Sequence, residues 1–185
     1  MRSIAKIAAG VAVVSCIALS LPVRANLIQD GGFETGDFTD WVKVAGQTYV
    51  ATGQANSGTY SVWLGQPQTL GYLSQSFATT PGATYDLSYF FAVAAPGANE
   101  FQVSVDGNVL VDQMFLPPQA YVKYDFQFTA TGSTSTLQFG FRDDPAYMYL
   151  DDVSVTTVPL PAALPLFTVG LAGIAGAGRF RRARS

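Results

Sequence analysis

Residues 26–157 form a succession of short segments in which apolar and polar side chains alternate with a period of two. The pattern is clearest in TYSVWLG (59–65), TYDLSYFF (84–91) and LQFGF (137–141). Because successive side chains of a strand point to opposite faces, this period predicts β-strands with one buried face. Turns rich in glycine, proline and threonine separate the segments, and signals for helices are absent. The expected fold is therefore all-β.

The number of segments narrows the architecture. We expect roughly nine or ten short strands, a pattern typical of a β-sandwich. The sequence Asp106-Gly107-Asn108 predicts a hairpin turn between two of them. The segments from which these strands would form cover residues 26–28, 41–45, 48–51, 59–65, 72–77, 84–91, 101–105, 108–111, 124–130, 137–141 and 147–155, eleven in all, of which one or two need not form strands.

Charge is distributed unevenly along the chain. All 13 acidic residues lie between Asp30 and Asp152, whereas only three of the 10 basic residues, Lys43, Lys123 and Arg142, lie within residues 26–157. This segment therefore carries a net charge of −10, although the whole chain carries −3. Such a charge repels nucleic acid and anionic lipid and favours a hard cation. Nucleic-acid binding is excluded as a function.

The residue types that are missing exclude several kinds of chemistry. The chain has no histidine, and its one cysteine, Cys16, lies near the N-terminus. A Ser-His-Asp triad and histidine-ligated zinc are therefore excluded. The pairs 143–144 and 151–152 are adjacent aspartates, and a glycosidase needs two carboxyl groups about 5–10 Å apart. Neighbouring side chains on a strand point to opposite faces, so the two carboxyl groups of an adjacent pair are poorly placed to act together as acid and nucleophile. We therefore expect no enzymatic activity.

The N-terminal 25 residues have the features of a secretory signal peptide. Arg2 and Lys6 precede an apolar run over residues 7–21, and small or β-branched residues occupy positions 23 and 25. This order predicts cleavage between Ala25 and Asn26. We therefore expect a protein that is exported across the inner membrane to the cell envelope, the outer surface or the extracellular matrix. The mature chain then contains no cysteine and no disulfide.

The C-terminal 28 residues have a different composition. From Leu160 to Gly178 there are 19 uncharged residues, close to the roughly 20 that span a bilayer as a helix. Prolines and glycines make this stretch only weakly hydrophobic. The four arginines within residues 179–184 are expected to stay on the cytoplasmic side. The segment predicts a marginal single-pass helix.

This C-terminal sequence also resembles a known sorting signal. Val158-Pro159-Leu160-Pro161-Ala162, a glycine-rich apolar run and RFRRAR follow each other as in the PEP-CTERM signals of Gram-negative bacteria, in the subtype whose motif reads VPLPA. In that family a membrane enzyme, exosortase, recognises the motif and removes the anchor, and the proteins accompany exopolysaccharide production. The resemblance implies exosortase as a partner, processing within 158–161 and transient contact with the membrane. The alternative is a permanent membrane tail.

A second resemblance covers residues 26–157. The segments at 26–41, 57–65, 73–77, 80–91 and 150–155 come in the order found in jelly-roll domains. The chain resembles galactose-binding-like folds and the carbohydrate-binding modules that recognise xylan or β-glucan. This implies three parts: a signal peptide (1–25), a jelly-roll β-sandwich (26–157) and a sorting segment (158–185). It also implies extracellular polysaccharide as a partner.

The same resemblance implies a structural calcium ion where the first strand of a jelly-roll meets the last. The matching ligands are Glu34, Asp152, the carbonyl of Gly32 and a carbonyl within residues 55–57, for which we take Ser57. Asp30 is a reserve ligand. Calcium takes six to eight oxygen ligands, and it would offset the repulsion between two nearby carboxylates. The alternative is that these carboxylates cap turns without a metal.

Aromatic residues make up 13% of the chain, and most of them, including Trp41 and Tyr60, are expected in the core. Those that face away from the apolar side or lie in turns are candidates for stacking on sugar rings. They are Trp63, Phe90, Tyr121 and Tyr147, with Tyr149 beside the last of them. The alternative is a second packing surface.

Together these features predict a secreted, non-catalytic protein of the envelope or exopolysaccharide matrix that contains calcium and binds polysaccharide. One alternative is a structural or adhesive matrix protein without a sugar site, which uses its acidic surface and calcium for self-association. A glycan-active enzyme is a third alternative.

Overall fold

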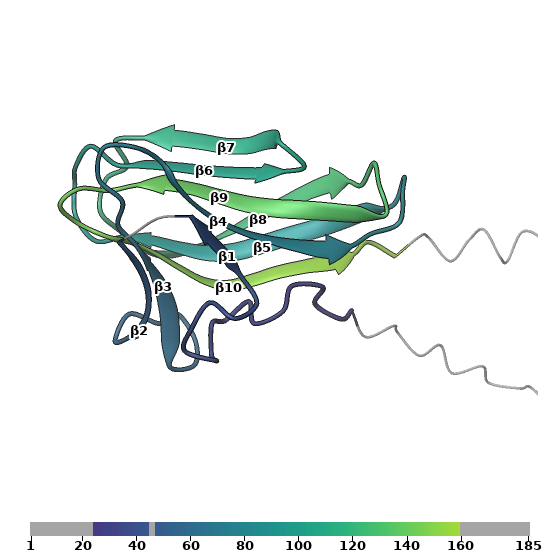
Figure 1. Cartoon of the computed structure of the whole chain (residues 1–185), viewed down its shortest axis with the longest axis horizontal. Helices are drawn as coiled ribbons and strands as arrows, with labels where there is room; N and C mark the ends of the chain where they lie inside the picture. Colours follow the sequence, from purple (N-terminus) through teal and green to yellow (C-terminus); the bar gives the residue numbers. More distant parts are fainter. Residues whose placement is uncertain (1–23, 45–46, 160–185) are drawn as a thin grey trace, which may run out of the picture.

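The computed structural model describes residues 24–44 and 47–159, which contain ten strands and no helix. The strands form two sheets that pack face to face, as the period-two alternation predicts (Figure 1). The all-β sandwich is therefore confirmed. The strands are β1 (Val42–Val44), β2 (Thr48–Thr52), β3 (Tyr60–Leu64), β4 (Gly71–Ala78), β5 (Thr84–Val93), β6 (Glu100–Val105), β7 (Asn108–Met114), β8 (Gln119–Thr129), β9 (Thr134–Arg142) and β10 (Met148–Thr157).

Each sheet has five strands. The first has the order β1-β4-β9-β6-β7 and the second the order β2-β3-β10-β5-β8, and neighbouring strands run antiparallel. The chain passes repeatedly from one sheet to the other, for example from β4 to β5 and from β9 to β10. The predicted hairpin joins β6 and β7, with Asp106 and Gly107 both at positive φ.

The core lies between the sheets and consists of the apolar half of each alternating segment. Leu87, Tyr89 and Phe91 of β5 are at most 1% exposed. Phe91 stacks on Phe101 of β6, with ring centroids 3.9 Å apart. Trp41 is buried, as expected. Tyr60, which we expected in the core, is only half-buried, at the edge of the core.

The segment 26–28, predicted as a strand, is irregular but still bonded to β10. Leu27 N donates to Val155 O at 2.8 Å, and Val153 N donates to Gly31 O at 2.8 Å. The Asn26 side chain accepts hydrogen bonds from the main chain on both sides of this contact. A Cβ at Gly31 would lie 2.0 Å from Val153 O, so only glycine allows this close approach.

The described chain begins at Arg24 and ends at Pro159, at one end of the sandwich (Figure 1). Val158 N still donates to Thr84 O of β5 at 2.9 Å, so the sandwich ends where the predicted sorting motif begins. Most of the predicted signal peptide and residues 160–185, including Leu160 and Pro161, lie outside the described residues. Within the described ranges, no helix is long and apolar enough to cross a membrane.

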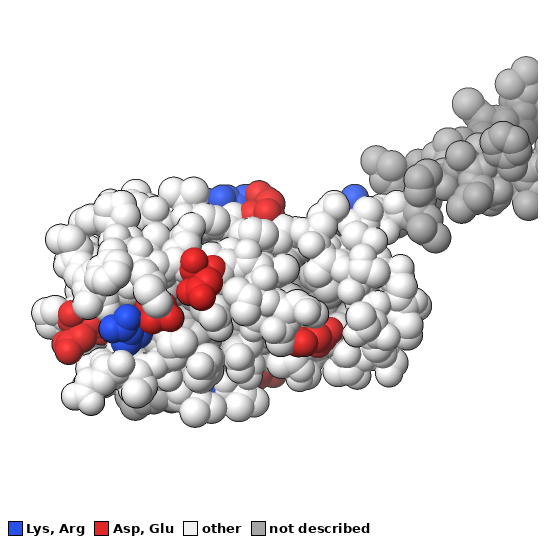
Figure 2. All heavy atoms as spheres, turned by 90° about the horizontal axis from the view of Figure 1, so that it is seen from above, with Lys and Arg blue, Asp and Glu red and all other residues white. Residues whose placement is uncertain are grey.

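Acidic side chains are scattered over a mostly uncharged surface in the view onto the first sheet's β7 edge (Figure 2). Three ion pairs form within the described part of the chain: Arg24–Asp86, Lys123–Asp125 and Arg142–Glu100. The fourth described base, Lys43, donates to a main-chain carbonyl instead. Most carboxylates therefore have no basic partner here.

Candidate functional site

Four aromatic side chains gather on the face of the second sheet that points away from the core. The strand registers place Tyr49, Trp63 and Tyr149 side by side on β2, β3 and β10. Trp63 meets Tyr149 edge to face, with centroids 5.2 Å apart, and lies 5.7 Å from Tyr147. Tyr147 in turn lies 6.4 Å from Tyr49. We call these four residues the aromatic patch.

The patch is held firmly by its surroundings. The ring of Tyr147 lies against Gly65, where a Cβ would come within 2.4 Å of the ring. Trp63, Tyr147 and Tyr149 are half-buried, whereas Tyr49 is 48% exposed. Burial raises the pKa of the Tyr149 hydroxyl. Tyr49 is therefore the member of the patch that is most open to solvent.

Phe90 and Tyr121, also predicted to bind ligand, lie on the same face. Phe90 of β5 is half-buried and pairs with Asp151 of β10 and Lys123 of β8. The Tyr121 hydroxyl donates to Gln54 O at 2.6 Å, so this side chain reaches from β8 to the turn after β2. Burial raises the pKa of this hydroxyl. All four predicted residues thus share one face, and the rings of Trp63 and Tyr147 pack against each other.

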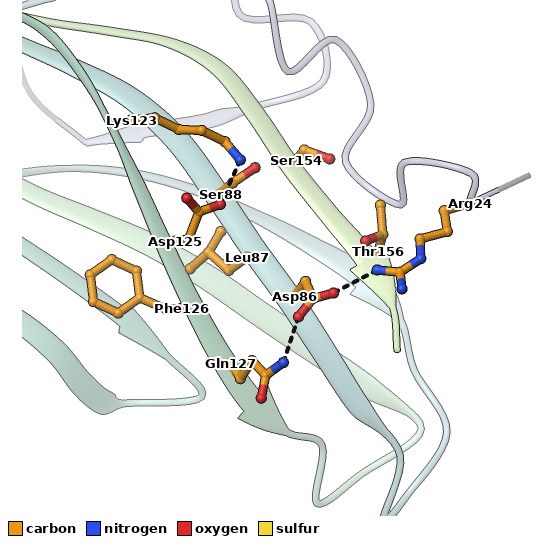
Figure 3. Close-up of a pocket in the computed structure, with 10 residues that line it drawn as sticks. All are labelled: Arg24, Asp86, Leu87, Ser88, Lys123, Asp125, Phe126, Gln127, Ser154 and Thr156. Carbon is orange, nitrogen blue, oxygen red and sulfur yellow. Dashed lines mark hydrogen bonds and ion pairs between the residues drawn. The ribbon is translucent and has the colours of Figure 1, made fainter. Parts of the chain in front are cut away.

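Beyond Phe90 the same face carries a depression of about 460 Å³ between β5, β8 and β10 (Figure 3). The registers place Ser88 between Ser154 and Asp125. We call this depression the polar groove. It is lined by Arg24, Asp86, Leu87, Ser88, Lys123, Asp125, Phe126, Gln127, Ser154 and Thr156.

Hydrogen bonds order the polar groove. Asp86 accepts from Gln127 Nε2 at 2.8 Å, and Lys123 donates to Asp125 at 2.6 Å (Figure 3). Asp86 also accepts from Arg24 at 2.7 Å, but Arg24 belongs to the predicted signal peptide and would be lost on cleavage. The groove offers hydroxyl, amide and carboxylate groups, which are the partners that sugar hydroxyls need. Sequence reasoning missed the groove because most of its polar residues occupy ordinary outward-facing strand positions.

Three carboxylates meet at the turn between β2 and β3, and we call them the carboxylate cluster. Glu34 accepts hydrogen bonds from Thr59 N at 2.9 Å and Tyr60 N at 3.0 Å. The carboxylates of Asp151 and Asp152 both accept hydrogen bonds from Asn56 and Ser57. Burial raises the pKa of the fully buried Asp151 to about 6, and hydrogen bonds from the main chain oppose the rise.

A β-bulge brings the two aspartates together. The register between β10 and β5 shifts after Asp151, and Asp152 has a φ of 50°. The adjacent carboxylates therefore reach one turn, whereas strict alternation predicted opposite faces. The main-chain amides of Asn56, Ser57 and Asp152 bind the Asp151 carboxylate, which gives it a structural role.

The predicted calcium ligands lie close together in this cluster. A Cβ at Gly32 would be 3.8 Å from both Asp152 Oδ1 and Glu34 Cγ. Ser57 takes part through its hydroxyl, which donates to Asp152 Oδ1 at 2.6 Å. Asp30, the reserve ligand, binds the Thr35 hydroxyl instead. Asp151, which also belongs to the carboxylate cluster, was not among the residues predicted from the sequence.

The chemistry of this donor set fits a hard cation, because it consists of carboxylate, hydroxyl and amide oxygens. The carboxylates also fit the alternative, since each already accepts hydrogen bonds from the turn. Among the described residues, no three acidic, histidine or cysteine side chains converge closely enough to hold one ion as they stand.

Comparison with known proteins agrees with this architecture. The CBM22-1 xylan-binding domain of Paenibacillus barcinonensis Xyn10C is similar over 76% of this chain and 100% of its own length, with a TM-score of 0.57 and 20% identity. The module TmCBM61, solved with β-1,4-galactotriose, gives a TM-score of 0.56 and 18% identity over 72% of this chain and 99% of its own. At such identities the likeness shows the fold alone, a jelly-roll β-sandwich.

A search of curated proteins found no sequence match. The profile of the family described as protein of unknown function (DUF642) matches residues 31–156, and the chain belongs to this family.

Proposed function

We propose that this DUF642 protein is an exported, non-catalytic protein of the cell envelope or extracellular matrix that binds polysaccharide on the outer face of its second sheet. One observation carries the proposal. The aromatic patch, Phe90 and the polar groove follow one another on a single sheet face.

The physical chemistry of sugars matches this order of groups. A pyranose ring presents apolar C–H faces that stack on aromatic rings, while its hydroxyls exchange hydrogen bonds with polar side chains. From Tyr149 to Thr156 the face extends for about 20 Å along β10, at about 3.3 Å per residue. A chain of several sugar units fits this length, with its apolar faces toward the patch and its hydroxyls toward the groove.

The fold and the place of the chain ends support the same role. The patch lies near the start of β10, whereas the described chain begins and ends at the opposite end of the sandwich (Figure 1). A protein held by a segment following Pro159 would direct the patch away from the membrane. The resemblance of residues 158–185 to a sorting signal supports export and release by exosortase.

The binding test uses the full chain in mild detergent and affinity electrophoresis through gels that contain β-1,4-xylan, β-1,4-galactan or the host exopolysaccharide. We expect retardation by at least one glycan. Tyr49→Ala should weaken binding about 3- to 10-fold, because an aromatic contact contributes about 0.5–1.5 kcal/mol. Tyr72→Ala, on the first sheet, is the matched control and should leave binding unchanged.

Two outcomes would overturn the proposal. If none of the glycans retards the protein, and sedimentation shows self-association that depends on calcium, the structural or adhesive alternative holds. If the two tyrosine variants lose binding equally, the sugar site lies elsewhere.

We also propose that the carboxylate cluster binds calcium through Glu34 and Asp152, with oxygens of Gly32 and Ser57. These two carboxylates bind one short turn and repel each other, and a divalent cation would offset that repulsion. In urea unfolding the wild-type chain should then be stabilised by calcium, and Asp152→Asn should be stabilised less. An equal gain in the wild type and this variant would favour turn capping without a metal.

A further inference from the structure

A second set of buried oxygens lies at the end of the sandwich remote from the chain ends. Asp143 follows β9 and is 2% exposed. Among the described residues, neither of its carboxylate oxygens has a hydrogen-bond partner of good geometry, although the adjacent main-chain amide of Asp144 interacts with the carboxylate. The adjacent base, Arg142, pairs with Glu100 at 3.0 Å instead. None of the ion pairs in the described ranges includes Asp143.

A buried carboxylate without a partner is costly, and proteins keep one where a bound species compensates it. The surroundings of Asp143 indicate which species is suitable. Gln66 O accepts a hydrogen bond from Asp143 N at 3.0 Å, and the buried Gln66 Oε1 also has no donor. A Cβ at Gly97 would lie 3.7 Å from both Asp143 Oδ1 and Asp144 O. These two oxygens therefore border the space that the missing side chain of Gly97 leaves.

We propose that Asp143 binds a calcium ion in this space, together with Gln66 Oε1 and the carbonyl of Asp144. The three groups are oxygen acceptors, and oxygen-only sets are what calcium takes. The net charge of residues 26–157 also favours a divalent cation.

This ion would tie together two loops at one end of the sandwich, those that follow β3 and β9, beside the loop after β5 that contains Gly97. The loop after β9 carries Tyr147, so the ion would also fix one member of the aromatic patch. With one carboxylate and neutral oxygens, we expect a dissociation constant of about 0.1–1 mM, the range of extracellular modules. The site shares no residue with the carboxylate cluster, and its calcium content can be measured without polysaccharide.

The test counts calcium ions on the full chain. The EDTA-stripped and dialysed protein is titrated with CaCl₂ by calorimetry, alongside Asp143→Asn, Asp152→Asn and the exposed control Asp112→Asn. Asp143→Asn should lose one ion per chain, whereas Asp112→Asn should bind as the wild type does. Asp152→Asn should keep the ion at Asp143, whether or not it loses one at the carboxylate cluster.

A gain-of-affinity variant guards against loss of the fold. Gln66→Glu places a second carboxylate in the set and should tighten calcium binding at least fivefold. If Asp143→Asn binds as many ions as the wild type with the same affinity, or if Gln66→Glu leaves the affinity unchanged, the proposal is wrong. The unpartnered oxygens would then be satisfied by water or by a proton.

Discussion

Asp143 should make the metal-free protein less stable as the pH rises. Burial and, to a smaller extent, the charge of the nearby Asp144 carboxylate raise its pKa to about 6, and the main-chain amide of Asp144 opposes the rise. In the unfolded chain an aspartate has a pKa of about 3.9. Between these values the folded protein binds a proton that the unfolded chain has lost. The free energy of unfolding therefore falls as the pH passes from about 4 to about 6.

The size of the effect follows from the two pKa values. A difference of about two pKa units at about 1.36 kcal/mol per unit gives roughly 3 kcal/mol. Asp143→Asn removes this loss, because an amide has nearly the same shape and stays neutral. Between pH 4 and pH 8, the free energy of unfolding of the variant should rise by about 2–3 kcal/mol relative to that of the wild type.

Urea unfolding in EDTA, followed by the fluorescence of Trp41 and Trp63, measures this gain at each pH. Asp151 also has a raised pKa, but it is present in both proteins, so their difference isolates Asp143. Saturating calcium at pH 8 should stabilise the wild type and so reduce the stability difference between Asp143→Asn and the wild type. Asp112→Asn, an exposed change of the same charge, should show no such trend. A stability difference that stays constant from pH 4 to pH 8 would refute the burial argument.

Three other substitutions test close contacts in different parts of the sandwich. Asn99→Ala should cost about 2–3 kcal/mol in urea unfolding, because the fully buried Asn99 side chain binds both the amide and the carbonyl of Leu116. Gly65→Ala should displace the Tyr147 ring, with which a Cβ would collide, and weaken glycan retardation in affinity gels. Gly31→Ala should lower the free energy of unfolding by about 1–3 kcal/mol, because its methyl group would meet the main chain of β10.

Most of the fold could be predicted from the sequence because the alternation of side chains is regular. In β5, for example, the apolar residues from Tyr85 to Phe91 at every second position are all buried. Alternation reports which side of a segment is buried, but not whether the segment pairs as a strand. Residues 26–28 are the exception, since Gly31 and the Asn26 side chain hold them to β10 without strand geometry.

The candidate site was predicted less completely, because it depends on which strands become neighbours. Trp63 and Tyr147 could be proposed from their own segments. Tyr49 joins them only because β2 pairs with β3, and that pairing has no local signal. The sequence shows Asp143 as one of two adjacent aspartates, but its burial depends on neighbours such as the loop that contains Gly97.

The bulge in β10 does have a signal in the sequence, and it determines the composition of the proposed binding face. Strict alternation continued from Leu150 would bury Asp152 and Ser154 and expose Val153 and Val155. The structure buries both valines fully or nearly so, which requires one extra residue after Leu150. Asp152 supplies it at a positive φ, a conformation that aspartate tolerates better than most residues. The three-residue step from Leu150 to Val153 therefore marks the bulge. This irregularity both joins the two aspartates at one turn and turns Ser154 toward the polar groove.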